Sequence, residues 1–452
     1  MIIMKSNLPE TPMDALAISG ALRAVVKIIH TWADVSGCWK YPSAKAAGDF
    51  EKMSLLDKMY WAYKSKKPII RAEKGSSLES YFKSNSDSIT LPDGFEKKHS
   101  VTFGAAGDLI KVPGLENSQD KLYEEVADLL FSKDISYANL ESQLTSQDLG
   151  AYTFSAKETP PLCCTKEQYK ALKSHQGKQY TMLHLACNHT MDMGLEGLET
   201  TLAQLQEDNI LELGVNREPG EKTKGRIIEK NGIKIGFVSA TYGLNGKTIP
   251  EGKEYMINVI PFHQKDSESN KVDISLLNQQ IRYCQEQKCD IIIASLHWGY
   301  EYEFFPRQAQ VDMAHEIIEM GVDAIISHHA HVPQPMEFYR PQRDPEKMAV
   351  IVYSLGNLTS SFSAPHIVLS TILNLTFVKG TVNGEEKTVI QDVQLTPVLQ
   401  IETMINDLPS LHIEKLETLS AKKGDKKGET WDDREYISAL EKYAALVLTK
   451  NV

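Results

Sequence analysis

The sequence lacks several features that would assign it to a particular class of protein. It contains six cysteines among 452 residues, and none of them forms a C-x-x-C pair, so neither a zinc ribbon nor a thioredoxin-like redox motif is indicated. The chain is also far longer than the small secreted scaffolds that depend on disulfides. We therefore expect a cytoplasmic protein with reduced thiols at Cys38, Cys163, Cys164, Cys187, Cys284 and Cys289.

A basic block and a long apolar run are missing as well. The formal charge is −11, and nucleic-acid binding is not favoured because attraction to phosphates requires clustered Lys and Arg residues. The best candidate for a membrane segment, residues 15–30, is interrupted by Arg23 and Lys27 and is shorter than the roughly 20 residues needed to cross a bilayer. Glu10 and Asp14 precede it, where a secretory signal would carry positive charge. We expect an amphipathic helix here and no membrane-spanning segment.

From residue 100 onward, short apolar runs alternate with helical patterns. The runs at 101–106, 135–138, 182–187, 291–296 and 324–326 predict strands. Apolar residues recur at helical spacing in 122–131, 195–207, 274–286 and 308–320, and this alternation predicts an α/β fold. Asn231-Gly232 and Asn383-Gly384 predict the turns of two β-hairpins, with strands at 227–229 and 233–238 and at 367–377 and 389–398.

The same patterns divide the chain into three parts. Residues 1–98 have helical patterns at 12–33 and 50–64 and a polar stretch at 74–98, which predicts a helical extension followed by a linker. Residues 99–400 form the expected main domain. Residues 401–452 are expected to be a tail with an exposed charged connection at 422–427 and a final helix at 430–448. A chain of this length is also too long for one ordinary hydrophobic core, so we expect either several domains or one large domain with extensions.

Polar residues follow five of the predicted strands immediately. Ligands of open α/β sheets bind outside the carboxyl ends of the strands, so these clusters should meet in one place. Their carboxylates, imidazoles and amide oxygens suit a borderline metal such as Zn, Mn or Fe. The clusters are Gly107-Asp108, Asn139-Leu140-Glu141, Asn188-His189, His297-Trp298-Gly299 and His328-His329-Ala330-His331.

Each cluster taken alone also has a structural interpretation. Asp108 is compatible with a turn or a helix cap, and Asn188 with a cap beside a packed His189. His297 is compatible with a structural pair to Glu301. Three histidines within four residues in the last cluster are harder to explain in this way. The joint occurrence of all five clusters at strand ends favours a metal site.

Six sequence blocks stand in a fixed order along the predicted main domain. The blocks are Gly107-Asp108, N-L-E-S at 139–142, N-H-x-x-D-x-G at 188–194, H-W-G-x-E at 297–301, H-x-H-V-x-Q at 329–334 and Y-S-L-G-N at 353–357. They resemble the CapA/PgsA family of bacterial poly-γ-glutamate capsule biosynthesis proteins, whose domain is related to the calcineurin-like metallophosphoesterases. The resemblance covers residues 100–400 and does not reach the first hundred. It implies a four-layer α/β/β/α sandwich of two mixed sheets with two metal ions, Mn, Zn or Fe.

The resemblance also implies roles for single residues. His189 would protonate the leaving group, and Asp192 would orient it. The implied metal ligands are Asp108, Glu141, Asn188, His297, His329 and His331. The implied substrate-binding residues are Asn139, Glu301, His328, Ser354 and Asn357.

The sequence departs from the family pattern at four places. Phosphoesterases of this group usually begin with Asp-x-His, but Ile110 stands at the second position after the aspartate, so one metal lacks a usual ligand. The block that ordinarily supplies a bridging Asp reads Asn-Leu-Glu. Cys187 stands where an Asn is common, and Ser327 where a Gly is common.

The predicted function is a metal-dependent hydrolase of the metallophosphoesterase type, related to poly-γ-glutamate biosynthesis, with a small or polymeric anionic substrate. One alternative is a non-hydrolytic accessory protein that binds a polyglutamate chain during capsule synthesis or export. It would work at the cell envelope with other capsule-synthesis proteins, and the expected lack of a membrane anchor counts against it. Another alternative is amide or peptide hydrolysis at the same metals.

Overall fold

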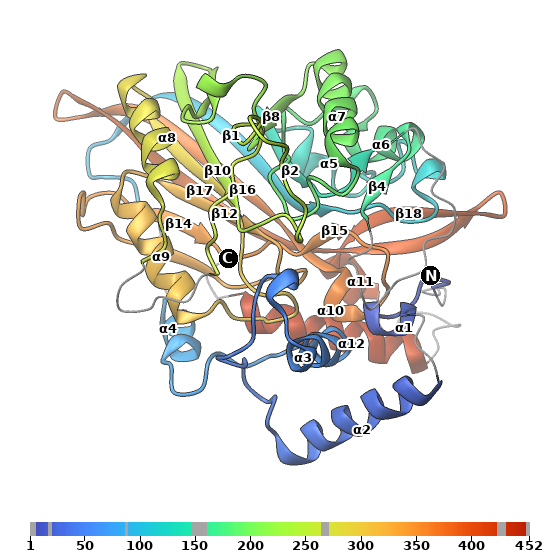
Figure 1. The fold of residues 1–452 in the computed structure, drawn as a ribbon. Helices are drawn as coiled ribbons and strands as arrows, with labels where there is room; N and C mark the ends of the chain where they lie inside the picture. Colours follow the sequence, from blue (N-terminus) through green and yellow to red (C-terminus); the bar gives the residue numbers. More distant parts are fainter. Residues whose placement is uncertain are drawn as a thin grey trace.

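Two large mixed β-sheets and the helices around them make up the fold (Figure 1). The computed structural model describes residues 6–16, 20–85, 89–145, 161–263, 271–422 and 431–448. One sheet has the order β18-β17-β16-β1-β2-β7-β8, with β15 paired to β1, and the other has the order β13-β14-β12-β11-β10-β9. Each contains parallel and antiparallel pairs, which confirms the predicted α/β class with mixed sheets.

The strands of the two sheets are as follows. The eight-stranded sheet contains β1 (Glu96–Leu109), β2 (Ile135–Leu140), β7 (Met182–His184), β8 (Leu211–Leu213), β15 (Asn357–Thr359), β16 (Leu369–Val382), β17 (Glu385–Ile405) and β18 (Leu408–Lys415). The six-stranded sheet contains β9 (Arg226–Lys230), β10 (Ile233–Thr241), β11 (Ile291–His297), β12 (Ala324–His328), β13 (Met336–Tyr339) and β14 (Ala349–Val352). Two short pairs lie outside them, β3 (Gln143–Leu144) with β4 (Cys163–Cys164) and β5 (Ser174–His175) with β6 (Lys178–Gln179).

Apolar side chains from both sheets form one shared core. The ring centroids of Phe103 on β1 and Phe237 on β10 lie 6.2 Å apart. Ile135, Ile293 and Ile326 belong to the same buried cluster, so the two sheets pack against each other. Strand β11 is buried along its whole length, as expected for a parallel strand covered on both faces.

Helices contribute to two further core clusters, one for each sheet. The cluster of the eight-stranded sheet contains residues of α5 (Ala127–Leu130), α6 (Lys166–Lys173) and α7 (Gly194–Asp208). The cluster of the six-stranded sheet contains residues of α8 (Ser275–Glu286) and α9 (Gln308–Glu319). Near the C-terminus, α10 (Pro365–Val368), α11 (Leu416–Lys422) and α12 (Trp431–Val447) pack around β16 and β17.

The N-terminal segment contains α1 (Pro12–Ala15), α2 (Gly20–Ser36), α3 (Leu55–Lys66) and α4 (Leu78–Ser84). Figure 1 shows α2 as the outermost of these, at the bottom of the view beside α3. Helix α3 begins with a capping box, because Ser54 accepts from the backbone of Asp57 and the Asp57 carboxylate accepts in return. At the other end of α3, the buried Lys64 ammonium lies 3.0 Å from the carboxylate of Glu303, in the segment after β11.

Several predicted elements differ from the structure. The helix predicted at 122–131 is reduced to α5, because 118–126 forms turns that bury the same apolar side chains without a continuous helix. The predicted linker 74–98 contains α4 and the start of β1, since Leu78 and Phe82 are buried against the domain. The strand predicted from 367 starts at Leu369 after α10, and the strand predicted over 182–187 ends at His184.

Other expectations are confirmed within the described residues. Both hairpins form, and Asn231, Gly232, Asn383 and Gly384 all have positive φ, as type I′ turns require. The terminal helix is α12, and the connection predicted at 422–427 lies outside the described residues beyond Lys422. β17 runs through residue 400, so the division at 98 and 400 stays a prediction. In the described part of the chain, no helix is long and apolar enough to cross a bilayer.

Candidate metal centre

The strand register places the polar clusters beside one another. Asp108 pairs with Asn139 on β2 and with Asn357 on β15. In the other sheet, His297 at the end of β11 pairs with His328 at the end of β12. Because these strands are parallel, their carboxyl ends meet at the same edge, as the sequence clusters require.

Asp108 is fully buried at the end of β1, where the chain passes closely beside a second loop. A Cβ atom added to Gly107 would lie only 2.0 Å from the carbonyl oxygen of Gly356, so glycine is needed there. The Asp108 carboxylate accepts from Asn139 Nδ2 at 2.9 Å and lies 3.0 Å from His328 Nδ1. Asn139 and His328 therefore fix the position of this carboxylate.

Glu141 differs from the other buried carboxylates of the site. It is fully buried, and neither of its oxygens has a hydrogen-bond partner in the described part of the chain. Its Oε1 lies 3.7 Å from His297 Nε2 and 4.0 Å from His189 Nε2. Burial first, then repulsion from Asp108, Glu301 and Asp192, raises the pKa of Glu141 well above its usual range.

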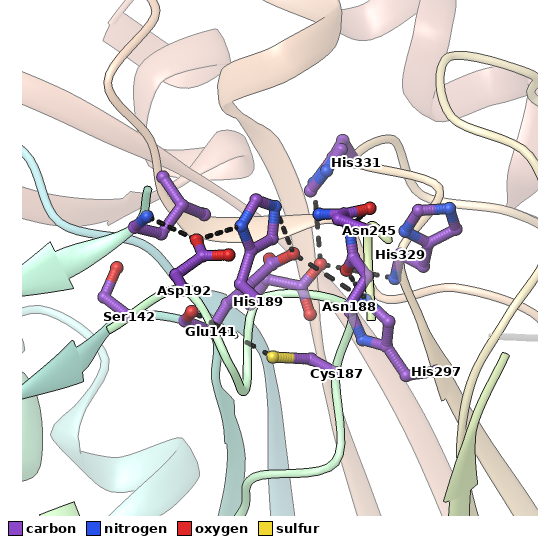
Figure 2. Close-up of polar contacts among 12 residues, drawn as sticks. Glu141, Ser142, Cys187, Asn188, His189, Asp192, Asn245, His297, His329 and His331 are labelled. Carbon is purple, nitrogen blue, oxygen red and sulfur yellow. Dashed lines mark hydrogen bonds and ion pairs between the residues drawn. The ribbon is translucent and has the colours of Figure 1, made fainter. Parts of the chain in front are cut away.

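His297 and Asn188 are held together by a hydrogen bond. His297 Nε2 and Asn188 Oδ1 are 2.8 Å apart, and Asn188 Nδ2 donates to Asn245 Oδ1 at 3.2 Å (Figure 2). Burial lowers the pKa of His297 well below 6.5, and nearby histidines, led by His329, lower it further. A neutral imidazole is the form that binds metals.

The H-A-H segment after β12 has unusual backbone geometry. His329 has φ +93° and His331 has φ +55°, a region that costs a residue other than glycine roughly 1–3 kcal/mol. The ring centroid of His329 lies 5.8 Å from that of His331 and 5.0 Å from that of His297. The His331 Nδ1 atom contacts Asn357 Oδ1 at 2.8 Å and lies 3.7 Å from the Asp108 carboxylate. Burial also lowers the pKa of His329 well below its usual value.

His189 is positioned by a carboxylate three residues later. Its Nδ1 lies 2.6 Å from Asp192 Oδ2, which also accepts from the backbone of Leu162 at 2.7 Å. Asp192 therefore orients the ring, and the opposite nitrogen faces Glu141 (Figure 2).

Two groups of side chains in the described residues have ligand atoms close enough to hold a metal ion. One consists of Glu301, His329 and His331, and the other of Asp108, Glu141 and His331. All their ligand atoms lie within 4.8 Å of one another in each group. The unpaired oxygens of Glu141 and the unpaired Nδ1 of His329 fit such a role, because buried polar atoms normally have partners.

The residues predicted to bind substrate occupy different places. Asn357 and Glu301 line the cavity that opens on the centre, and Glu301 also belongs to a candidate metal group. Asn139 and His328 are fully buried behind Asp108. Ser354 Oγ accepts from the Gly356 backbone at 3.1 Å and so stabilises the loop.

Four residues near the centre do not appear among the sequence predictions. Tyr242 and Asn245 follow β10, which runs three residues beyond the strand predicted at 233–238, so the strand-end rule points to them only with the observed strand end. Trp61 donates to the Glu301 carboxylate from α3, and His263 contacts Asp49 at 2.9 Å and the Gly299 backbone at 3.1 Å. These three contacts join separate parts of the chain, and no local pattern predicts them.

Fold and site together define an α/β protein with a candidate metal centre of histidines and carboxylates at the strand ends. A family model described as "Bacterial capsule synthesis protein PGA_cap" matches residues 95–361, which is more than half of the chain. The chain therefore belongs to this family of capsule synthesis proteins, as the sequence blocks predicted.

Curated relatives give the same family assignment. The chain is similar to the "PGA biosynthesis protein CapA" of Bacillus subtilis (strain 168), with 29% identity over 54% of this chain and 57% of the relative. It is 27% identical to the "Capsule biosynthesis protein CapA" of Bacillus anthracis over 53% of each chain. A "Probable polyglutamine synthesis accessory protein" of Mycobacterium tuberculosis is 23% identical over 51% of this chain and 56% of its own length. The chain thus spans about half the length of the curated relatives it matches.

Proposed function

We propose that this protein is a metal-dependent hydrolase of the phosphoesterase type that acts in capsule or poly-γ-glutamate synthesis. We also propose that its sheets and helices form the four-layer sandwich of the calcineurin-like metallophosphoesterases. The observation that supports the activity is the buried carboxylate of Glu141, which has no hydrogen-bond partner among the described residues and lies between His189 and His297. A buried charge without a partner costs several kcal/mol, by an order-of-magnitude estimate, so a cation is the expected partner.

The proposed centre holds two ions of Mn, Zn or Fe, since its donors combine imidazoles with carboxylates. When bound, the metals polarise a phosphoryl oxygen and neutralise its charge. The proposed ligands are Asp108, Glu141, Asn188, His297, His329 and His331, with Glu301 as a further carboxylate.

His189 would act on the leaving group. As the oxygen of a water molecule forms the new P–O bond and the ester P–O bond breaks, the protonated imidazole would donate its proton to the departing alkoxide, and the proton released by the water would restore the imidazolium. Asp192 keeps the ring in place for this transfer through the 2.6 Å contact. An imidazole suits the step because its unperturbed pKa lies near the working pH.

A second candidate function is binding of an anionic polyglutamate chain without cleavage. It is favoured by the word "accessory" in the name of the mycobacterial relative. Both candidate functions use the same centre at the strand ends, so a measurement of substrate turnover distinguishes hydrolysis from binding alone.

The test uses the full chain, purified and then loaded with Mn, Zn or Fe. Bound metal is counted by mass spectrometry, and the protein is offered a phosphomonoester, a phosphodiester and a γ-glutamyl amide, with and without chelator. We expect chelator-sensitive hydrolysis of a phosphoester. Cleavage of the amide alone would replace the phosphoesterase assignment by amide hydrolysis. Binding of polyglutamate with no turnover of any substrate would refute the hydrolase proposal.

A further inference from the structure

The cavity that opens on the candidate metal centre has two kinds of wall. Its volume is about 250 Å³, and its inner end includes Asn188, His189, Glu301 and His331. The outer wall comes largely from the N-terminal helices and the segment between them. It includes Met13, Leu16, Leu22, Val26, Phe50 and Leu55, all of which are apolar.

This outer wall does not suit a polyanion. Carboxylates of a polyglutamate chain need cations or hydrogen-bond donors, and burying them against apolar side chains is costly. Lys58 and Lys111 are the two lysines among the described lining residues. The Lys58 ammonium lies 4.4 Å from the centroid of the Phe50 ring, which places it against the wall rather than at the metal centre. The wall therefore fits an apolar group attached to an anionic head.

The apolar wall continues onto the outer surface of the protein. Leu22 and Leu55 line the cavity and are also 39% and 72% exposed. Beside them on the same two helices, large apolar side chains point to solvent, namely Val25, Ile28, Trp32, Val35 and Leu56. Contiguous exposed apolar surface marks a binding site more often than chance. Here it leads from the face of α2 to the histidines of the centre.

We propose that the substrate is an amphiphile, with an anionic phosphate group at the metal centre and an alkyl or acyl chain along the apolar wall formed by the N-terminal helices. This assignment rests on the proposed function and names its substrate class. Each methylene buried along the wall should raise affinity about fourfold, which corresponds to roughly 0.8 kcal/mol. The N-terminal segment, which lies outside the matched part of the family, thus acts as the specificity element for the chain of the substrate.

The test measures binding of two phosphonates that lack a scissile ester, methylphosphonate and octylphosphonate, to the manganese-loaded full chain by calorimetry. Octylphosphonate is kept below the concentration at which it forms micelles. We expect it to bind at least about tenfold more tightly, which requires burial of only two or three methylenes. Equal affinities, or no binding of either ligand, would overturn the amphiphile proposal.

Matched variants show where the octyl group of the ligand binds. Leu22→Asp and Leu55→Asp should lower octylphosphonate affinity about tenfold and leave methylphosphonate unchanged, because both side chains line the cavity mouth. Val35→Asp and Leu56→Asp are the controls, since both lie on the same helices, are exposed and do not line the cavity. Equal losses in all four variants would indicate adsorption to the outer face and would refute binding in the cavity. Phosphoester turnover is measured separately, so failure of hydrolysis with intact octyl preference rejects the catalytic proposal alone.

Discussion

Replacing Glu141 by glutamine should have opposite effects on the metal-free and metal-loaded protein. The carboxyl group is fully buried without a hydrogen-bond partner in the part of the chain that the structure describes, and Asp108, Glu301 and Asp192 repel its ionised form. Glu141→Gln keeps the shape and cannot ionise. Because the raised pKa makes the folded parent hold a proton that the unfolded chain has released above the usual carboxyl pKa, the stability of the parent falls as the pH rises, and in chelator at neutral pH the variant should be the more stable protein.

The metal-loaded proteins should rank in the reverse order. A ligand present at 100 times its dissociation constant stabilises the folded state by about 2.7 kcal/mol. The variant loses a charged ligand, so it should lose most of this stabilisation. Thermal unfolding of both proteins in chelator and in excess manganese gives the four melting temperatures that the comparison needs.

Glu303→Gln is the matched control, because Glu303 is equally buried but fully paired. Its carboxylate contacts Lys64 at 3.0 Å and Arg307 at 3.0 and 3.1 Å. Breaking such a buried ion network should cost about 3–5 kcal/mol with or without metal. If Glu141→Gln behaved like this control in both conditions, the unpaired carboxylate would be a structural group and the metal assignment would be refuted.

The remaining predictions concern five other positions. His329→Ala and His331→Ala should each lower metal content measured by mass spectrometry, because imidazoles of one loop would hold the ion; unchanged stoichiometry would remove them from the site. His189→Asn should keep the metal and slow turnover by roughly 10²–10⁴ fold, and equal loss of metal would make His189 a ligand. Burial lowers the pKa of His366 from 6.5 to about 4, so the unfolded chain binds the proton first as the pH falls. Stability from this group is complete above pH 6.5 and decreases toward pH 4 by about 1.4 kcal/mol per pH unit, and His366→Gln should remove that slope in urea unfolding. Ile110→His should tighten one metal, as measured by titration.

The polar clusters of the site could be predicted because parallel strands impose a simple rule. Each cluster follows a strand, and parallel neighbours carry their ends to one edge. Asp108 and Asn139 are register neighbours for this reason, and so are His297 and His328, whereas Asn357 reaches Asp108 from the start of β15. The type of element was predictable for the same segments, since apolar runs and helical spacing are local signals.

The contacts of the N-terminal segment could not be predicted in the same way. Lys64 and Trp61 lie on one helix, yet their partners Glu303 and Glu301 are more than 200 residues away. Sequence spacing carries no information on such pairs. Helix α4 was missed for a related reason, because its buried Phe82 packs against Phe305 and Tyr353, far away in the sequence, and the helix is too short for a long periodic pattern.

Ile110 stands where related phosphoesterases usually carry the histidine of Asp-x-His, and the structure shows how this residue is placed beside the centre. It lines the cavity two residues after the fully buried Asp108, and both its backbone N–H and its C=O are bound by Thr359 Oγ1, at 2.9 and 2.7 Å. The position of its side chain is therefore well determined, but an apolar group gives a metal no bond. The group formed by Asp108, Glu141 and His331 shares its imidazole with the second group, so it should be the weaker site.

Ile110→His supplies that group with an imidazole of its own on a backbone already held in place. Each added ligand contributes a coordinate bond, so the second ion should bind at lower metal concentration in the variant than in the parent. Titration with manganese, followed by counting of bound ions, measures this directly, and Ile110→Leu serves as the control for a changed apolar shape. Two tightly held ions in the parent protein, or the same affinities in the histidine and leucine variants, would contradict the assignment of a weak site at Asp108. If only the histidine variant binds the second ion more tightly, the missing ligand, and not the fold, limits metal occupancy of this centre.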